Sequence, residues 1–117
     1  MEVLKKRISE KEIKSGFFYG LGGFQKATLA YYDLKNKKYT TRKMKGGPYE
    51  VLGLTGNVSQ KDGELFIHCH AVLGKRDFHT VGGHLMEATV GGTLEIYFNE
   101  TEKLERKFNE ETGLNLL

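Results

Sequence analysis

Cysteine, proline and tryptophan are almost absent from this chain of 117 residues, which holds one cysteine, one proline and no tryptophan. Because Cys69 has no partner in the chain, an internal disulfide is excluded and a reducing compartment such as the cytoplasm is expected. No apolar run approaches the roughly 20 residues of a membrane-spanning helix, and residues 1–10 lack the apolar centre of a signal peptide. We therefore expect a single cytoplasmic domain over residues 1–117, with no membrane partner.

Glycine is abundant, by contrast, and charge is unevenly distributed. The chain holds 15 glycines, so its turns rely on the freedom of glycine at positive φ. Residues 1–50 carry 12 Lys and Arg against 5 Asp and Glu, a net +7, whereas residues 51–117 carry 6 against 10, a net −4. A basic half is typical of proteins that bind nucleic acid or another anionic partner. Lysines that only solvate a helix and an edge strand would produce the same count.

One helix and a series of strands are expected from the hydrophobic pattern. Residues 2–14 favour a helix that Gly16 ends. The expected strands are residues 27–33, 39–44, 51–58, 64–73, 84–90 and 93–98. Residues 103–117 suit either a second helix or a short strand with a turn. This order predicts an α+β fold, with a mainly antiparallel β-sheet of about six or seven strands and one N-terminal helix. Glycines inside the strands predict bulges, bends or the close approach of another backbone.

The clearest alternation lies in residues 64–73. One face of this expected strand is entirely apolar and consists of Leu65, Ile67, Cys69, Ala71 and Leu73. That face should pack on the core, while His68 and His70 point to the opposite side. Cys69 is thereby excluded as a ligand beside the histidines, and without a basic neighbour it is a poor nucleophile.

Three histidines form the sharpest candidate site. His68 and His70 share one side of a strand, and His84 would join them if the next strand forms a hairpin with the first. Three nitrogen ligands with one vacant position make an open zinc site; nickel, cobalt or iron are alternatives. The same histidines could instead serve only in packing and hydrogen bonding. His79 is either a fourth ligand or a solvated loop residue, and Glu87 is out of phase with His84 and is not expected to act as a general base.

Other catalytic patterns are missing from the sequence. It contains no Gly-X-Ser-X-Gly elbow, no P-loop and no dinucleotide fingerprint after a strand. Residues 20–23 are rich in glycine, but no helix follows them to present its amides to a phosphate. The motifs therefore predict no enzymatic reaction, apart from what a metal at the histidines would allow.

Several stretches occur in the order of a known family. They are Gly20–Gly23 leading into residues 27–33, Gly47–Gly56, the histidine strand, Gly82–Leu85 and Glu111–Leu114. Through them, residues 13–117 resemble the PPC domain family, named for its presence in plants and prokaryotes, which follows AT-hook motifs in plant nuclear proteins. The sequence has no Arg-Gly-Arg-Pro core of an AT-hook. Its N-terminus also looks shorter than in the family, without the strand that precedes the helix.

The resemblance implies an α+β fold assembled as a homotrimer, in a DNA-binding or regulatory protein. The family's histidines correspond to His68, His70 and His84. In the plant proteins, one stretch contacts partner transcription factors. Its counterparts here are the expected partner-binding residues Gly47, Tyr49, Glu50, Val51 and Leu52. Pro48 stands where the plant motif usually has arginine.

Our leading prediction is a trimeric binding module associated with DNA or transcription-related proteins, carrying zinc on the three histidines, and not an enzyme. The alternative is a zinc-dependent enzyme or small-ligand-binding protein that uses the same histidines. A third hypothesis is a purely structural oligomer in which the histidines only pack.

Overall fold

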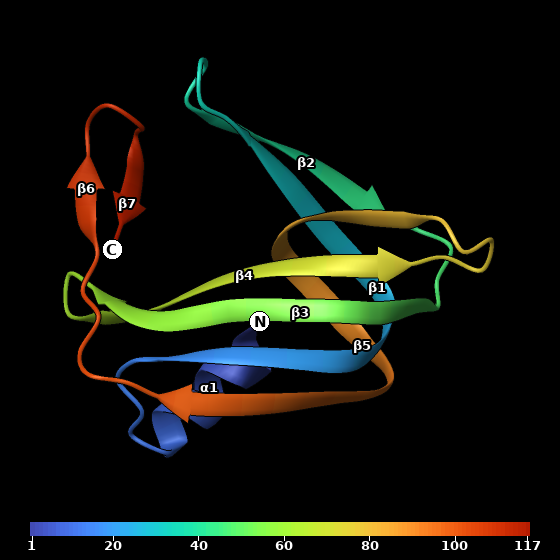
Figure 1. The fold of residues 1–117 in the computed structure, drawn as a ribbon, viewed down its shortest axis with the longest axis horizontal. Coiled ribbons are helices and arrows are strands. Elements are labelled where there is room, and N and C mark those ends of the chain that lie inside the picture. Colours follow the sequence, from blue (N-terminus) through green and yellow to red (C-terminus); the bar gives the residue numbers. More distant parts are fainter.

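A computed structural model describes all residues 1–117 and confirms a mainly antiparallel sheet with one N-terminal helix. The helix is α1 (Glu2–Glu10). The seven strands are β1 (Gly16–Asp33), β2 (Lys38–Met44), β3 (Tyr49–Lys61), β4 (Glu64–Gly74), β5 (Thr80–Glu100), β6 (Lys107–Asn109) and β7 (Leu114–Leu116). Figure 1 shows the long strands crossing the molecule, with α1 behind the sheet.

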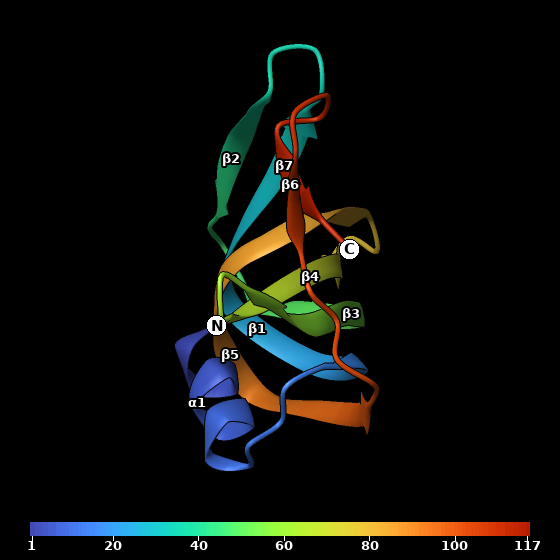
Figure 2. The same cartoon turned by 90° about the vertical axis from the view of Figure 1, so that its left-hand side faces the viewer.

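The main sheet has the strand order β2-β1-β3-β4-β5, and β1 pairs with β5 as well. All of these pairings are antiparallel. Because β5 pairs with both β4 and β1, the four strands β1, β3, β4 and β5 form a closed circuit of hydrogen-bonded neighbours. β2 pairs only with the second half of β1 and lies at the edge, as its charged sequence predicts. In both views the β6–β7 hairpin lies above α1, toward the tip of the β1–β2 hairpin (Figures 1 and 2).

The prediction of separate strands over residues 84–90 and 93–98 is wrong, because both belong to β5. Glycines bend this strand instead of ending it. At the bend, a Cβ on Gly22 of β1 would run into the carbonyl oxygen of Thr93, and one on Gly23 into that of Gly91. Glycine therefore lets the two backbones approach while they stay paired, with a register shift after Gly22.

The helix predicted over residues 2–14 ends four residues early, at Glu10. Glu12 has a positive φ of 56°. Its N–H donates to the Ser9 carbonyl at 3.0 Å, and the Ile13 N–H donates to the Ile8 carbonyl at 3.2 Å. This pair of bonds is a capping pattern in which glycine usually takes the left-handed position. A glutamate holds that position here, so the sequence carries no glycine signal for the helix end.

The core lies between α1 and one face of the sheet. Ile8 of α1 is buried in the same cluster as Phe24, Val58 and Leu73. On β4 the predicted apolar face is confirmed, since Cys69 and Leu73 are both buried while His70 on the other face is exposed. The sheet face that carries the histidines is thus left open for contacts other than the core.

The C-terminal tail forms a strand, a turn and a strand, and the alternative of a second helix is wrong. Gly113 takes a positive φ of 72° in the turn. The tail is tied to β3 by backbone hydrogen bonds on both sides of Gln60, one to Leu104 and one from Arg106, each at 2.8 Å. It is tied to the β1–β2 hairpin where the Tyr32 hydroxyl donates to the Thr112 carbonyl. The tail therefore spans from β3 to the tip of that hairpin.

No helix of the structure has both the length and the apolar composition needed to cross a membrane.

Candidate metal centre

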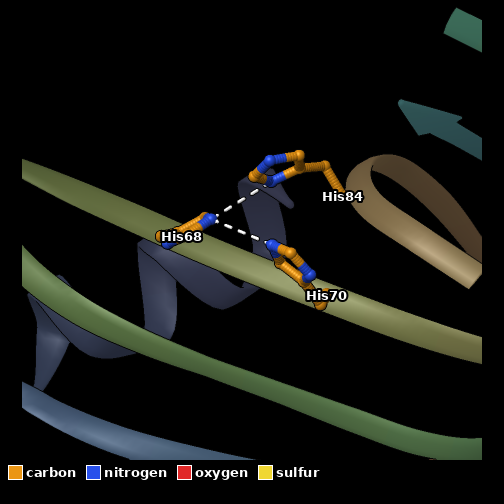
Figure 3. A group of neighbouring side chains, drawn as sticks. All are labelled: His68, His70 and His84. Atoms are coloured by element: carbon orange, nitrogen blue, oxygen red, sulfur yellow. Dashed lines mark hydrogen bonds between the residues drawn. The ribbon is translucent and has the colours of Figure 1, made fainter. Parts of the chain in front are cut away.

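The structure brings the three predicted histidines together on two neighbouring strands. β4 and β5 pair through a short connection, residues 75–79, so both strands extend into the segment 74–83 that separates the two predicted strands. His70 lies directly opposite His84 in the register, and His68 precedes His70 by two residues on the same face. Figure 3 shows the three rings turned toward one another, two from β4 and one from β5.

The ring nitrogens converge at one point. His68 Nε2 lies 3.1 Å from His84 Nδ1 and also 3.1 Å from His70 Nε2. All three ligand atoms lie within 4.8 Å of one another. Two nitrogens bound to one tetrahedral zinc at Zn–N distances of 2.0–2.1 Å are about 3.3 Å apart. Two of the three separations are therefore close to what one such ion requires, and the residues present fit a divalent metal.

Hydrogen bonding alone is a poor account of this cluster. A ring nitrogen of neutral imidazole carries either one hydrogen or one lone pair. His68 Nε2 therefore cannot make good hydrogen bonds to His84 and His70 at the same time. Three lone pairs directed at a shared cation would use all three nitrogens.

Burial favours the neutral form of His68 and His84. It is the main cause that lowers the pKa of His68 to about 4, and the neighbouring histidine rings and Arg106 add to it. The pKa of His84 is also lowered, by burial and by the positive charge that His70 can carry. Neutral imidazole is the form that binds metal, so these ligands are available at pH 7 without losing a proton.

Arg106 is a neighbour of the site that sequence reasoning missed. It is only 8% exposed, and its guanidinium donates hydrogen bonds to Ser59 Oγ, the Asn115 carbonyl and Asn57 Oδ1. Asn57 is the cross-strand partner of His68. Because the contacts of Arg106 come from distant segments, no local sequence signal could have identified it.

A pocket adjoins the histidines on the open face of the sheet. Two rows of cross-strand neighbours define it, one running Tyr97–Tyr19–Thr55–His70 and the other Asn99–Phe17–Asn57–His68. We call this cavity of about 460 Å³ the histidine pocket; Phe18 and Gly56 complete its lining.

The other candidate residues lie apart from the cluster. His79 is exposed in the loop, with Nδ1 at 3.4 Å from Asp77 Oδ2. Glu87 lines a different pocket, and a register shift near it breaks the strict alternation used to orient it. Cys69 is buried on the opposite face of β4, where burial raises the pKa of its thiol to about 12. The thiol is therefore protonated, as expected of an unreactive cysteine.

The five expected partner-binding residues divide between core and surface. Tyr49 and Val51 are buried, and Gly47 is half-buried. Glu50 and Leu52 are exposed on the other side of β3. A partner could reach only these last two side chains directly.

Comparison with solved structures shows the same fold in several proteins. A plant- and prokaryote-conserved (PPC) protein from Pyrococcus horikoshii is 36% identical, with a TM-score of 0.90 over 98% of this chain and 80% of that one. A metal-containing protein from Archaeoglobus fulgidus is 35% identical, with a TM-score of 0.89 over 98% of this chain and 81% of that one. A "putative DNA-binding protein" from Bacteroides thetaiotaomicron is 29% identical, with a TM-score of 0.92 over 98% and 80%. A comparison with curated proteins finds no match.

The family model of the Plants and Prokaryotes Conserved (PCC) domain matches residues 1–102. The matched range includes the three histidines and the glycine stretches of β1, β3 and β5. Residues 111–114, which also resemble the family, lie beyond it. The chain therefore belongs to the Plants and Prokaryotes Conserved domain family, the one that its glycine and histidine stretches resemble.

Proposed function

We propose that this chain is a homotrimeric binding module that carries a divalent metal, zinc first, and associates with DNA or with transcription-related proteins. His68, His70 and His84 would hold the ion. The observation that carries the metal proposal is the approach of three ring nitrogens to one point, with two separations of 3.1 Å around His68 Nε2. The metal-containing relative from Archaeoglobus fulgidus adds support.

A zinc ion on three neutral imidazoles would supply Lewis-acid chemistry at an open position. The histidine cluster includes no carboxylate, and Cys69 and Glu87 lie outside it. The chain therefore places no carboxylate general base in the histidine cluster. This composition supports a binding role over the alternative of a zinc-dependent enzyme.

An exposed apolar patch supports the proposed trimer. Leu21, Leu52 and Val72 are 58%, 60% and 46% exposed, and they lie on the adjacent strands β1, β3 and β4 near the shifts in register. Large side chains gathered in this way mark an interaction surface. We propose that a second copy of the chain covers this patch, with Glu50 at its edge as a polar contact.

A basic surface supports the proposed association with DNA. Lys26, Lys43 and Lys45 line one pocket of about 490 Å³ between β1, β2 and β5, with Glu87 as its single acidic residue. The net +7 of residues 1–50 is thus partly concentrated at one place on the surface. Phosphate groups are the natural counterions of such a cluster.

Metal content tests the central proposal. We expect about one metal ion per chain, by inductively coupled plasma mass spectrometry, in protein purified without a metal-affinity tag. His68→Ala, His70→Ala and His84→Ala should each lose it, whereas the loop variant His79→Ala should keep it. Folded protein without metal, even after dialysis against zinc, would contradict the proposal.

Salt-dependent duplex binding tests the nucleic-acid proposal. The affinity should fall as salt rises, with a log–log slope of about −0.9 per phosphate contact. Lys26→Gln combined with Lys43→Gln should make that slope shallower by about two contacts, while Lys75→Gln in the β4–β5 loop should leave it unchanged. An affinity independent of salt would argue against DNA.

Light scattering on the same samples measures the oligomer, and Leu52→Glu should dissociate a trimer.

A further inference from the structure

The histidine pocket lacks a negative charge to balance a bound metal. None of its ten lining residues is acidic: they are Phe17, Phe18, Tyr19, Thr55, Gly56, Asn57, His68, His70, Tyr97 and Asn99. Three neutral imidazoles leave the full charge of a divalent cation uncompensated. A charge in a partly desolvated site is stabilised by an opposite charge nearby. An anion from outside the chain would supply the missing charge.

Arg106 adds a second positive charge next to the pocket, where it is hydrogen-bonded to the lining residue Asn57. It is nine-tenths buried, and its three side-chain hydrogen bonds go to a hydroxyl, a backbone carbonyl and an amide oxygen, all neutral. It forms no salt bridge with a carboxylate. Buried arginines are usually paired, so an anion in the histidine pocket would offset this charge as well.

The Arg106 contact also orients Asn57 toward such a ligand. Arginine is a hydrogen-bond donor only, so the amide atom 2.8 Å from it must be the oxygen, Oδ1. The NH₂ group of Asn57 then points away from Arg106. Asn57 lines the pocket directly opposite His68 in the sheet. The wall beside the metal ligands therefore presents a donor, which suits an oxygen acceptor on the ligand.

The far wall of the pocket is aromatic. The Tyr19 and Tyr97 rings stack with centroids 5.2 Å apart, and each residue is 60% exposed. Phe17 on the neighbouring row is also exposed. An exposed aromatic pair without an apolar cover offers a surface on which a flat apolar group can pack. A cavity of about 460 Å³ holds a small organic molecule.

We propose that the histidine pocket binds a small organic anion, with its carboxylate or phosphate oxygens beside the histidine-bound metal and the Asn57 amide, and its planar apolar body on Tyr19 and Tyr97. The inference rests on the proposed metal site. The open coordination position of that metal would be filled by an aromatic or other planar anion. The positive charge of the site favours the anionic group, and the Tyr19–Tyr97 wall favours the planar body.

Cobalt-loaded protein tests this without any assay of activity, because the visible spectrum of Co²⁺ reports its coordination. The probes are benzoate, phenyl phosphate, acetate and neutral benzamide. We expect benzoate or phenyl phosphate to change the spectrum saturably, and the two arms show which oxyanion is preferred. Acetate should bind about tenfold more weakly, since ~1.4 kcal/mol of apolar contact is missing. Binding of benzamide as tight as that of benzoate, or no response to either aromatic anion, would overturn the inference.

Two variants separate the parts of the site. Asn57→Asp removes the donor and adds a negative charge, so it should weaken benzoate binding at least tenfold and retain cobalt. Asn36→Asp, in the exposed β1–β2 turn, is its charge-matched control. Tyr97→Ala should bring benzoate affinity down to that of acetate, whereas exposed Tyr31→Ala should not. If cobalt does not bind, the metal site fails and this inference fails with it. If cobalt binds and the anions do not, this inference alone fails.

Discussion

The two faces of β4 differ sharply although they alternate along the same eleven residues. On one face Cys69, Ala71 and Leu73 are buried in the core. On the other His68 is half-buried and His70 exposed, and both take part in the candidate metal centre. Successive side chains of a strand point to opposite sides, so folding free energy and metal affinity depend on different residues. Substitutions on the two faces should therefore have separable effects.

The largest effect on stability is expected on the core face. Leu73 is 0% exposed, and Leu73→Ala should lower the free energy of unfolding by about 2–5 kcal/mol. Variants that stay folded should still bind zinc, because the histidines are untouched. Urea unfolding measures the change. Glu64→Ala, at the exposed start of the same strand, is the control and should cost less than about 1 kcal/mol. Equal losses would break the distinction between the faces.

The converse substitution is on the histidine face. His70→Ala should reduce zinc affinity at least about 100-fold. Losing a residue that only hydrogen-bonds a metal ligand costs up to about 100-fold, and His70 is itself a proposed ligand. Because His70 is exposed, the metal-free protein should lose under about 1 kcal/mol of stability. Calorimetric zinc titration and urea unfolding of the same sample test both statements. A metal-free variant that fails to fold would show that His70 is structural.

Acid should weaken the metal-free protein through its histidine face. The pKa of His68 is about 4 in the folded state, below its ordinary value of 6.5. Between these pH values the unfolded chain takes up a proton that the folded chain does not. The free energy of unfolding should therefore fall as pH drops from about 6.5 toward 4. Above pH 6.5 the contribution of His68 to stability should be complete.

Urea unfolding across that pH range measures this dependence. His68→Gln, which cannot titrate, should give a shallower fall than the native protein. An identical slope in both would assign the acid sensitivity to other groups.

The smallest effect on metal binding is expected at Cys69. Cys69→Ala should leave zinc affinity within about twofold and lower the free energy of unfolding by about 1 kcal/mol, since only one small buried group is lost. A thiol reagent should modify native Cys69 far more slowly than unfolded Cys69, because the thiol is buried and its pKa is raised to about 12. Rapid labelling of the native protein would contradict the assigned face.

The candidate site could be predicted in part because its first two histidines obey a local rule. A period of two places His68 and His70 on one side wherever the strand lies. His84 is different, since its approach depends on how β5 pairs with β4, and the register puts it opposite His70. Arg106 could not be predicted at all. Its hydrogen-bond partners Ser59, Asn57 and Asn115 belong to two segments that only the folded tail brings together.

The errors in secondary structure have a related origin. Gly91 and Gly92 are a turn signal in the sequence, yet the same freedom that makes a turn also lets β5 bend against the glycines of β1. Glu12 ends α1 in a conformation that usually calls for glycine. In both places the local residues permit two conformations, and long-range contacts select one.

The sequence alone determined the period of each strand, the apolar face of β4, the absence of an internal disulfide and the uneven charge, because these depend on residue identity and on spacing along one segment. The tertiary structure alone decided that β1 and β5 bend together, that His84 meets His70, and that Arg106 contacts Asn57. Those features depend on pairing and packing between segments far apart in the chain. Their free energy comes from contacts that exist only after the sheet has formed.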